Sequence, residues 1–363
     1  MAEQSMVFIT SFAPGEAGAI TAFNLDTATG ALEPLARNAE VENPFFIALT
    51  PDRKHLYATH LPGDFESESG YIAAFEIVGN AGELRKINEQ PAQGTTTCYV
   101  DVDPTGKAVV CANYNSGSIG SYPLQADGSL GEMRSFMQHQ GASQVNAQRQ
   151  DAAHAHCAAI SPSGRHVFAC DLGLDQVIGY ALDAESAQLT PLEQPYVRTL
   201  GGGGPRHFTY HPQGAYVYAN NELDNSVNVY SYDGDTGLLI ERQVISTLPD
   251  EFSGLSYTAD LKITPDGRYL YCTNRIHDSI AIYRIGADGC LTLVEIQPSL
   301  GNFAQNLAIT PDGSLLLCAN MHAEDTDGDG ANLVIFRIDA ASGKLTALGE
   351  PVAMARPSCI AIV

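Results

Sequence analysis

The sequence predicts an all-β protein, a seven-bladed β-propeller whose blades are four-stranded antiparallel sheets. A turn followed by an apolar strand that ends in a polar residue occurs six times, at residues 51–60, 104–113, 162–171, 212–221, 265–274 and 311–320. The six turn prolines are separated by 53, 58, 50, 53 and 46 residues. A repeat of this length that contains only strand signals is typical of propellers and solenoids. A ring of such repeats also brings equivalent loops together around one central opening.

Each repeat contains the signals for four strands. An apolar inner strand precedes the turn, at residues 45–50, 98–103, 156–161, 206–211, 259–264 and 305–310. Turns of the Pro-Asp-Gly-Arg type close a hairpin with the second strand, because Pro presets φ and Gly accepts a positive φ. An alternating third strand occurs seven times, at residues 19–25, 71–77, 118–124, 176–182, 226–232, 279–285 and 332–338. A further turn then leads to a short fourth strand.

The two ends of the chain are expected to supply the seventh blade. Residues 356–363 (RPSCIAIV) have the pattern of an inner strand, and residues 6–12 (MVFITSF) have that of a second strand without its turn. Side by side they complete a blade, close the ring and hide two sheet edges. We therefore expect residues 1–363 to form one propeller domain. The WD40 class is disfavoured, because the sequence has no tryptophan and hence no Trp-Asp signature.

The charge balance disfavours two classes of partner. The chain has 42 acidic and 19 basic side chains and a net charge of −23, and such a surface repels nucleic acid and anionic membranes. The first residues contain no basic start and no long apolar run, so we expect a cytoplasmic protein without a signal peptide or spanning helix, a monomer or weak homo-oligomer. Cys111, Cys272 and Cys318 occupy a repeat position that Ala fills in other copies, which predicts reduced core cysteines.

Candidate functional residues gather on one face of the predicted ring. Inner and second strands run antiparallel, so residues just before each inner strand lie beside residues just after each second strand, opposite the turns. This face receives His60, Asn113, Tyr114, His154, His156, Asp171, Arg206, His207, Asn221, Glu222, Asp260, Asn274, Arg275, His277, Met321, His322 and Arg356. The longest insertion, the Gln-rich residues 135–153, also opens onto this face and is expected to form a wall or lid.

Arg206, Arg275 and Glu222 are the main candidates for chemistry on this face. Two arginines at the mouth of a chain with few basic residues indicate an anion site, because Arg binds carboxylate or phosphate bidentately. The alternative is that they only neutralise Glu222 and Asp260. The asparagines near the ends of second strands are interpreted as structural caps instead: Asn113, Asn220 and Asn320.

Two patterns bear on metal binding. His154 and His156 lie two apart on a strand and should share a face, but catalytic zinc needs three protein ligands and local spacing supplies no third. A metal-free acid/base role is therefore preferred. Asp325, Asp327 and Asp329 match the opening of a calcium loop, although Phe336 stands where the twelfth-position glutamate belongs. A structural calcium ion and an acidic turn that binds nothing are the two interpretations of this segment.

The chain resembles the lactonase family of seven-bladed propellers, which includes propeller-type 6-phosphogluconolactonases and the fungal carboxy-cis,cis-muconate cyclase. Four segments carry the resemblance, which extends over nearly the whole chain: HAHCAAISPSGRHVFACDLGLDQVIGY (154–180), GPRHFTYHP (204–212), YANNEL (218–223) and ADLKITPDGRYLYCTNR (259–275). It implies a catalytic set of His156, Arg206, Glu222 and Arg275. Gln305 departs from the family pattern, since many relatives carry Arg there.

The resemblance implies a lactonase without a cofactor that hydrolyses an anionic sugar-acid lactone, with 6-phosphogluconolactone of the pentose phosphate pathway as the expected substrate. The same site would suit a carboxymuconate cycloisomerase, and a non-catalytic binding propeller is the alternative from another class. In hydrolysis, Glu222 or His156 would be the base, and Arg206 and Arg275 would bind the oxyanion or an anionic group. The further substrate-binding residues expected are His154, His207, Asp171, Asp260, Arg149 and Arg356, with the last two as candidates for a phosphate.

Overall fold

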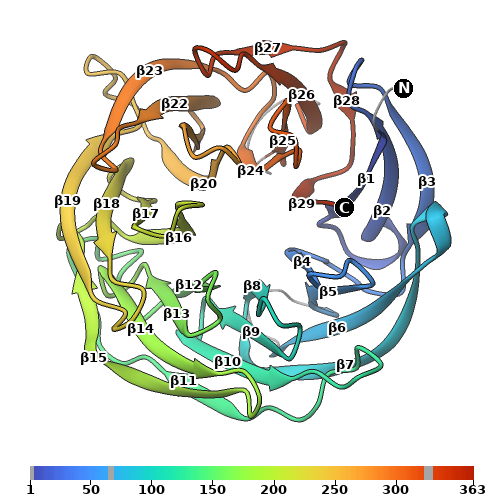
Figure 1. The fold of residues 1–363 in the computed structure, drawn as a ribbon, viewed down its shortest axis with the longest axis horizontal. Coiled ribbons are helices and arrows are strands. Elements are labelled where there is room, and N and C mark those ends of the chain that lie inside the picture. Colours follow the sequence, from blue (N-terminus) through green and yellow to red (C-terminus); the bar gives the residue numbers. More distant parts are fainter. Residues whose placement is uncertain (1–3, 64–68, 323–329) are drawn as a thin grey trace.

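Seven antiparallel sheets are arranged as blades around a central axis in the computed structural model, which describes residues 4–63, 69–322 and 330–363 (Figure 1). Six sheets have four strands, and the seventh carries a fifth, short strand at its outer edge. Consecutive strands along the chain are neighbours within each blade, so the blades are built from hairpins, except where the two ends of the chain pair with each other. The predicted seven-bladed propeller is confirmed.

The strands fall into four concentric sets. The inner strands are β29 (Pro357–Ile362), β4 (Ile47–Leu49), β8 (Thr97–Val102), β12 (Ala155–Ile160), β16 (Pro205–Tyr210), β20 (Tyr257–Ile263) and β24 (Ala304–Ile309). The second strands are β1 (Gln4–Ser11), β5 (His55–His60), β9 (Ala108–Asn113), β13 (His166–Asp171), β17 (Tyr216–Asn221), β21 (Tyr269–Arg275) and β25 (Leu315–Asn320). All six complete repeats therefore have the predicted inner and second strands.

The outer half of each blade follows the same order. The third strands are β2 (Ala19–Asp26), β6 (Ser69–Val78), β10 (Ser118–Pro123), β14 (Gln176–Asp183), β18 (Ser226–Tyr232), β22 (Ser279–Ile285) and β26 (Asn332–Ile338). The fourth strands are β3 (Leu32–Asn38), β7 (Glu83–Thr95), β11 (Ser135–Gln138), β15 (Gln188–Arg198), β19 (Leu239–Ser246), β23 (Leu291–Pro298) and β27 (Leu345–Ala347), with β28 (Val352–Ala353) paired to β26. Two 3₁₀ turns, η1 (Gly15–Ala17) and η2 (Gly79–Ala81), interrupt the loops.

The chain ends close the ring. Strand β29 pairs antiparallel with β1, with Val7 opposite Ile362 and Ile9 opposite Ile360, and the two termini lie in the same blade (Figure 1). Inside this seam the Thr10 hydroxyl lies 2.7 Å from the Ser358 hydroxyl and accepts the Cys359 backbone N–H at 2.8 Å. The predicted split blade is confirmed, and it removes the two free edges that an open ring would leave.

Thr10 offers a test of this seam. Thr10→Val keeps the side-chain shape but leaves the Cys359 N–H and the Ser358 hydroxyl without this buried partner, so we expect the free energy of unfolding to fall by about 1–3 kcal/mol. The measurement is urea denaturation at neutral pH. Thr346→Val is the matched control, because Thr346 lies exposed on β27 and should change the stability by less than about 0.5 kcal/mol.

Neighbouring blades are joined by apolar packing and by a repeated tyrosine hydrogen bond. Tyr218 of β17 is fully buried among side chains of the next blade and donates its hydroxyl to the Gly289 carbonyl at 2.9 Å. Tyr57 and Tyr271, at the same repeat position, make the same bond to the next blade at 2.8 Å. At Gly289, with φ +77°, a Cβ atom would lie 2.4 Å from the Tyr216 ring, so this turn requires glycine.

Two expectations about the rest of the chain are settled by the fold. All eight cysteines are free, and Cys111, Cys272 and Cys318 are fully buried, as the repeat predicted. The insertion is shorter than predicted, because residues 135–138 form β11, which pairs with β10 as an ordinary fourth strand. Only residues 139–153 form a loop on the predicted face. No helix in the described ranges is long and apolar enough to cross a membrane.

Candidate active site

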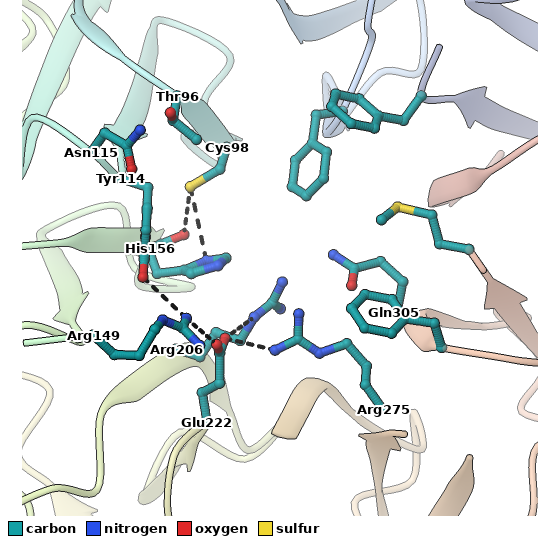
Figure 2. Close-up of a pocket in the computed structure, with 14 residues that line it drawn as sticks. Thr96, Cys98, Tyr114, Asn115, Arg149, His156, Arg206, Glu222, Arg275 and Gln305 are labelled. Atoms are coloured by element: carbon teal, nitrogen blue, oxygen red, sulfur yellow. Dashed lines mark hydrogen bonds and ion pairs between the residues drawn. The ribbon is translucent and has the colours of Figure 1, made fainter. Parts of the chain in front are cut away.

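A cavity of about 430 Å³ lies at one end of the central axis, on the face predicted to carry the functional residues. Its lining combines polar and apolar side chains, and Arg149, Arg206, Glu222 and Arg275 gather on one side of it (Figure 2). The other polar members of the lining are Thr96, Tyr114, Asn115, His156 and Gln305. The remaining lining residues are Phe12, Phe45, Cys98, Phe303 and Met321. Every blade contributes at least one of these side chains, so the cavity exists only in the closed ring.

β-Bulges in the inner strands direct side chains into this cavity. The ladders between inner and second strands skip one residue near the start of five inner strands, and the skipped residues are Cys98, His156, Arg206, Gln305 and Ser358. All of them except Ser358 line the cavity. A bulge adds an unpaired residue and re-aims its side chain. The alternation of an ideal strand therefore does not apply here, and four of these blades each turn the skipped side chain toward the axis.

Glu222 is the centre of the charged cluster on this side of the cavity. Its Oε2 atom lies 2.9 Å from Arg206 Nε and 2.8 Å from Arg275 Nη2, and its Oε1 atom pairs with Arg149 Nη2 (Figure 2). Burial alone would raise the pKa of Glu222, but the three guanidinium charges outweigh it and hold the pKa well below its ordinary value. The cluster thus contains three positive charges and one negative charge, which leaves an excess of two positive charges beside the cavity.

Each arginine is held by contacts besides Glu222. Arg149, from the loop 139–153, bonds the Tyr114 hydroxyl at 3.1 Å, and Arg275 donates from Nη2 to the Thr258 carbonyl at 3.2 Å. Arg206 is 1% exposed and donates from Nη1 to the Ala259 carbonyl. Burial lowers the pKa of Arg206 to about 10, with a further contribution from the charge of Arg275, so it stays protonated at neutral pH. The guanidinium groups are fixed in orientation before any ligand binds.

His156 is the histidine of the cavity lining, and its ring is neutral. Burial, followed by the positive charge of Arg206, lowers its pKa well below the ordinary value. Its Nδ1 atom lies 3.8 Å from Cys98 Sγ, and its ring packs edge-on against Tyr114 at 5.3 Å. A neutral imidazole has a lone pair that can accept a proton, whereas both carboxylate oxygens of Glu222 are already held by guanidinium groups.

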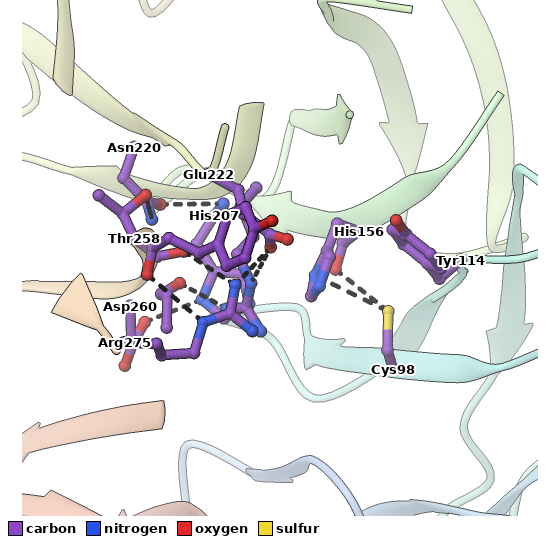
Figure 3. A network of polar contacts seen from close by, with 12 residues as sticks. Cys98, Tyr114, His156, His207, Asn220, Glu222, Thr258, Asp260 and Arg275 are labelled. Carbon is purple, nitrogen blue, oxygen red and sulfur yellow. Dashed lines mark hydrogen bonds and ion pairs between the residues drawn. The ribbon is translucent and has the colours of Figure 1, made fainter. Parts of the chain in front are cut away.

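His207 and Asp260, which were predicted to bind substrate, lie outside the cavity lining and next to each other (Figure 3). Arg206 Nη1 lies 3.1 Å from His207 Nε2, and His207 Nδ1 lies 2.9 Å from Asp260 Oδ1. Because Arg can only donate, Nε2 accepts and Nδ1 carries the proton toward Asp260. Burial lowers the pKa of His207 to about 4, so the ring is neutral. These two residues orient Arg206.

Three other predicted residues also lie outside the cavity lining. Asp171 is fully buried, pairs with His139 Nδ1 at 2.6 Å and accepts the His154 backbone N–H, so it organises the loop 139–153. The His154 ring stacks on Tyr114 at 4.7 Å and supports the cavity wall from behind. Arg356 lies over the Phe12 ring at 5.2 Å. Of the six residues predicted to bind substrate, only Arg149 reaches the cavity.

The sequence contained two candidate metal-binding patterns, a histidine pair and an aspartate-rich segment. His154 and His156 do not share a face, because the bulge of β12 lies between them and only His156 enters the cavity. Among the described residues, no group of three or more His, Cys, Asp and Glu side chains is placed to hold a metal ion. Asp325, Asp327 and Asp329 lie outside the described residues.

The predicted structural asparagines make the expected contacts. Asn113 donates to the Ser118 hydroxyl at 3.1 Å and accepts from the Thr97 hydroxyl at 2.7 Å. Asn220 accepts the His207 N–H at 3.0 Å. Asn320 is fully buried and donates to Asn332 at 2.8 Å. None of the three lines the cavity, so the interpretation as structural caps is confirmed.

Several cavity residues were not among the predicted site residues, and a simple signal in the sequence identifies three of them: Phe45, Cys98 and Gln305. The signal is the first residue of each predicted inner strand, because five of these six first residues line the cavity, the other two being His156 and Arg206. The sixth, Ala259, presents its carbonyl to Arg206 instead. The start of the inner strand is thus the position of the repeat that meets at the axis.

The sequence is similar to those of known proteins with the same architecture. The family described as "Lactonase, 7-bladed beta-propeller" matches residues 6–362. The chain is 34% identical over 354 residues to 6-phosphogluconolactonase of Bacillus subtilis, with 97% of each chain covered, and 31% identical to that of Formosa agariphila, with 95% of each covered. The solved structure of the periplasmic gluconolactonase of Pseudomonas aeruginosa superimposes with a TM-score of 0.91 at 27% identity and covers 99% of both chains.

Proposed function

The chain belongs to the lactonase family of seven-bladed β-propellers, and on that premise we propose that it is a hydrolase that opens an anionic sugar-acid lactone, with 6-phosphogluconolactone as its substrate. The observation that carries the proposal is the cluster of Arg149, Arg206 and Arg275 around the single carboxylate of Glu222. The relatives named 6-phosphogluconolactonase support the same substrate.

The charge of the cluster favours an anionic ligand. The whole chain carries a net charge of −23, whereas the cavity wall has two more positive than negative charges. Glu222 alone cannot neutralise three guanidinium groups, so the interpretation that the arginines serve only to neutralise acidic side chains is insufficient. An anionic ligand group would complete the charge balance. Arg149, whose side chain is 31% exposed, is the proposed contact for a phosphate.

Hydrolysis requires a proton acceptor for the attacking water, and His156 fits this role better than Glu222. Both groups have a pKa below the ordinary value, but both carboxylate oxygens of Glu222 are held by guanidinium groups, whereas the imidazole of His156 makes no ion pair with the described residues. In the proposed mechanism, the water oxygen bonds to the lactone carbonyl carbon while a proton passes to His156. Collapse of the tetrahedral intermediate breaks the ring C–O bond, and protonated His156 returns the proton to the leaving alkoxide.

Arg206 and Arg275 are proposed to stabilise the oxyanion of the tetrahedral intermediate. Their orientation is fixed by Glu222, by backbone carbonyls and, for Arg206, by His207. Donors that are already oriented stabilise developing charge without reorganisation during the reaction. Glu222 therefore acts through the arginines that it aligns.

Replacing Arg206 by alanine should lower kcat/KM about a hundredfold, the usual effect of removing one oxyanion donor. The measurement is initial-rate kinetics on 6-phosphogluconolactone at neutral pH. Arg284→Ala is the matched control, because Arg284 is exposed on β22, and its kinetics should equal those of the wild type. An Arg206→Ala variant with unchanged kcat/KM would remove Arg206 from the mechanism.

A lactone panel tests the proposed function. The protein is assayed at neutral pH with 6-phosphogluconolactone, glucono-δ-lactone and a carboxymuconolactone, and spontaneous opening is subtracted. We expect the highest kcat/KM with the phosphorylated lactone. Turnover of the muconolactone alone would assign the cycloisomerase activity instead. Failure to accelerate any of the three reactions would overturn the proposed hydrolase.

A further inference from the structure

Gln305 is a cavity residue that the hydrolytic mechanism leaves without a role. Gln305 lies at the bulge of β24 and is 4% exposed, and its side chain lines the cavity. Its Oε1 atom is buried and accepts no hydrogen bond from the described residues. A buried amide oxygen without a donor is destabilising, and most such atoms in folded proteins are satisfied. A donor from a bound ligand would satisfy this one.

The surroundings of Gln305 differ from those of the arginine cluster. It lies across the cavity from His156, because β12 and β24 belong to blades on opposite sides of the ring (Figures 1 and 2). Phe303 and Met321, which flank β24 and β25 of the same blade, add apolar surface beside it, and the other apolar side chains of the lining are Phe12 and Phe45. Arg275 approaches this wall from the arginine cluster and lies over the Phe303 ring at 5.0 Å. Gln305 thus supplies an uncharged polar group between the apolar part of the lining and the edge of the cluster.

We propose that the Gln305 amide binds a hydroxyl group of the substrate and thereby selects polyhydroxylated lactones. This inference rests on the proposed function and names the substrate class of the same site. Oε1 needs a donor, and carboxylate or phosphate oxygens that are fully ionised have no hydrogen to donate. The anionic group of the substrate is drawn to the arginines, so the donor to Gln305 is a neutral hydroxyl elsewhere on the same molecule.

A hydrogen bond of this kind discriminates between substrates. A lactone without hydroxyl groups would leave Oε1 buried and unpaired, and sites built to bind a hydroxyl reject analogues that lack it. We expect the wild type to prefer glucono-δ-lactone over unsubstituted δ-valerolactone in kcat/KM. Replacing Gln305 by Met, which has a similar length but no amide, should reduce this preference by about 10- to 100-fold.

The test compares both lactones with the wild type, Gln305→Met and the matched control Gln297→Met, which lies on the outer strand β23. The control should keep the wild-type preference. Gln305→Glu keeps an acceptor of the same length and should retain most of it, which separates the hydrogen bond from a general effect of substitution. An equal change of kcat/KM on both lactones in Gln305→Met would overturn the proposal while the hydrolase function stands.

Measurements of ligand binding test the role of Gln305 independently of catalysis. If the wild type opens no lactone, the proposed hydrolase activity is wrong. Calorimetry with 6-phosphogluconate and with 6-phosphohexanoate still tests the role of Gln305, because these two ligands share their charged groups and differ only in their hydroxyl groups. We expect the wild type to bind 6-phosphogluconate at least tenfold more tightly and Gln305→Met to lose that difference. The same affinity ratio in both proteins would overturn the assignment of Gln305.

Discussion

Replacing His156 by alanine is expected to lower kcat/KM for the lactone by about 10²–10⁴-fold, the usual contribution of a positioned general base. His156 lines the cavity, and its lowered pKa keeps the imidazole neutral at pH 7. The measurement is initial-rate kinetics with spontaneous opening subtracted. His154→Ala is the matched control, because the His154 ring lies behind Tyr114, and it should lose far less activity.

The pH dependence gives an independent readout of the same residue. The active form of a base is the unprotonated one, and burial lowers the pKa of His156 well below 6.5. The wild-type kcat/KM should therefore be constant between about pH 6.5 and 8 and should fall only at lower pH. Added imidazole should restore part of the activity of His156→Ala. An inflection above pH 7, or an alanine variant with wild-type kcat/KM, would contradict the role of His156.

The fold could be predicted in detail because the repeat determines it locally. Turn prolines, alternating third strands and the small Ala/Cys position are each visible in a few residues, and the pairing of β29 with β1 follows from counting incomplete repeats. The face that carries the site follows from the antiparallel order of inner and second strands. These patterns are local in the sequence, and the closed ring then determines where each of these strands lies in space.

The composition of the site could be predicted only in part. His156, Arg206, Glu222 and Arg275 all line the cavity. The sequence could not show that the ladder skips a residue at the start of an inner strand, and this bulge decides that Gln305 enters the cavity. A position on the correct face is necessary for a site residue, but the local register decides where its side chain lies.

Long-range contacts explain the remaining differences. Arg149 lies 73 residues from Glu222 in the sequence, and only the folded loop 139–153 brings the two together. Asp171 lies 32 residues from His139, its partner in a buried pair. No local pattern predicts either contact. The predicted face therefore contained both residues that touch the cavity and residues that support it, and the sequence could not separate them.

Replacing Glu222 by alanine is expected to affect stability as well as activity. The variant leaves three guanidinium groups without their common partner, two of them 1% and 10% exposed, and removal of one member of a buried ion pair typically costs about 3–5 kcal/mol. The measurement is the free energy of unfolding from urea denaturation at pH 7. Glu193→Ala, at an exposed position of β15, is the matched control and should change it by less than about 0.5 kcal/mol.

The difference in the free energy of unfolding between the wild type and Glu222→Gln should become smaller as the pH falls. The pKa of Glu222 in the folded protein is well below its ordinary value, so the folded state binds this proton more weakly than the unfolded state. The stabilisation is fully present above about pH 4.3, the ordinary pKa of Glu, and is lost as the pH falls further. Glu222→Gln has no such proton, so its deficit should be largest at pH 7 and should shrink in acid. A deficit that stays constant down to pH 3 would show that the charge of Glu222 does not hold the three arginines.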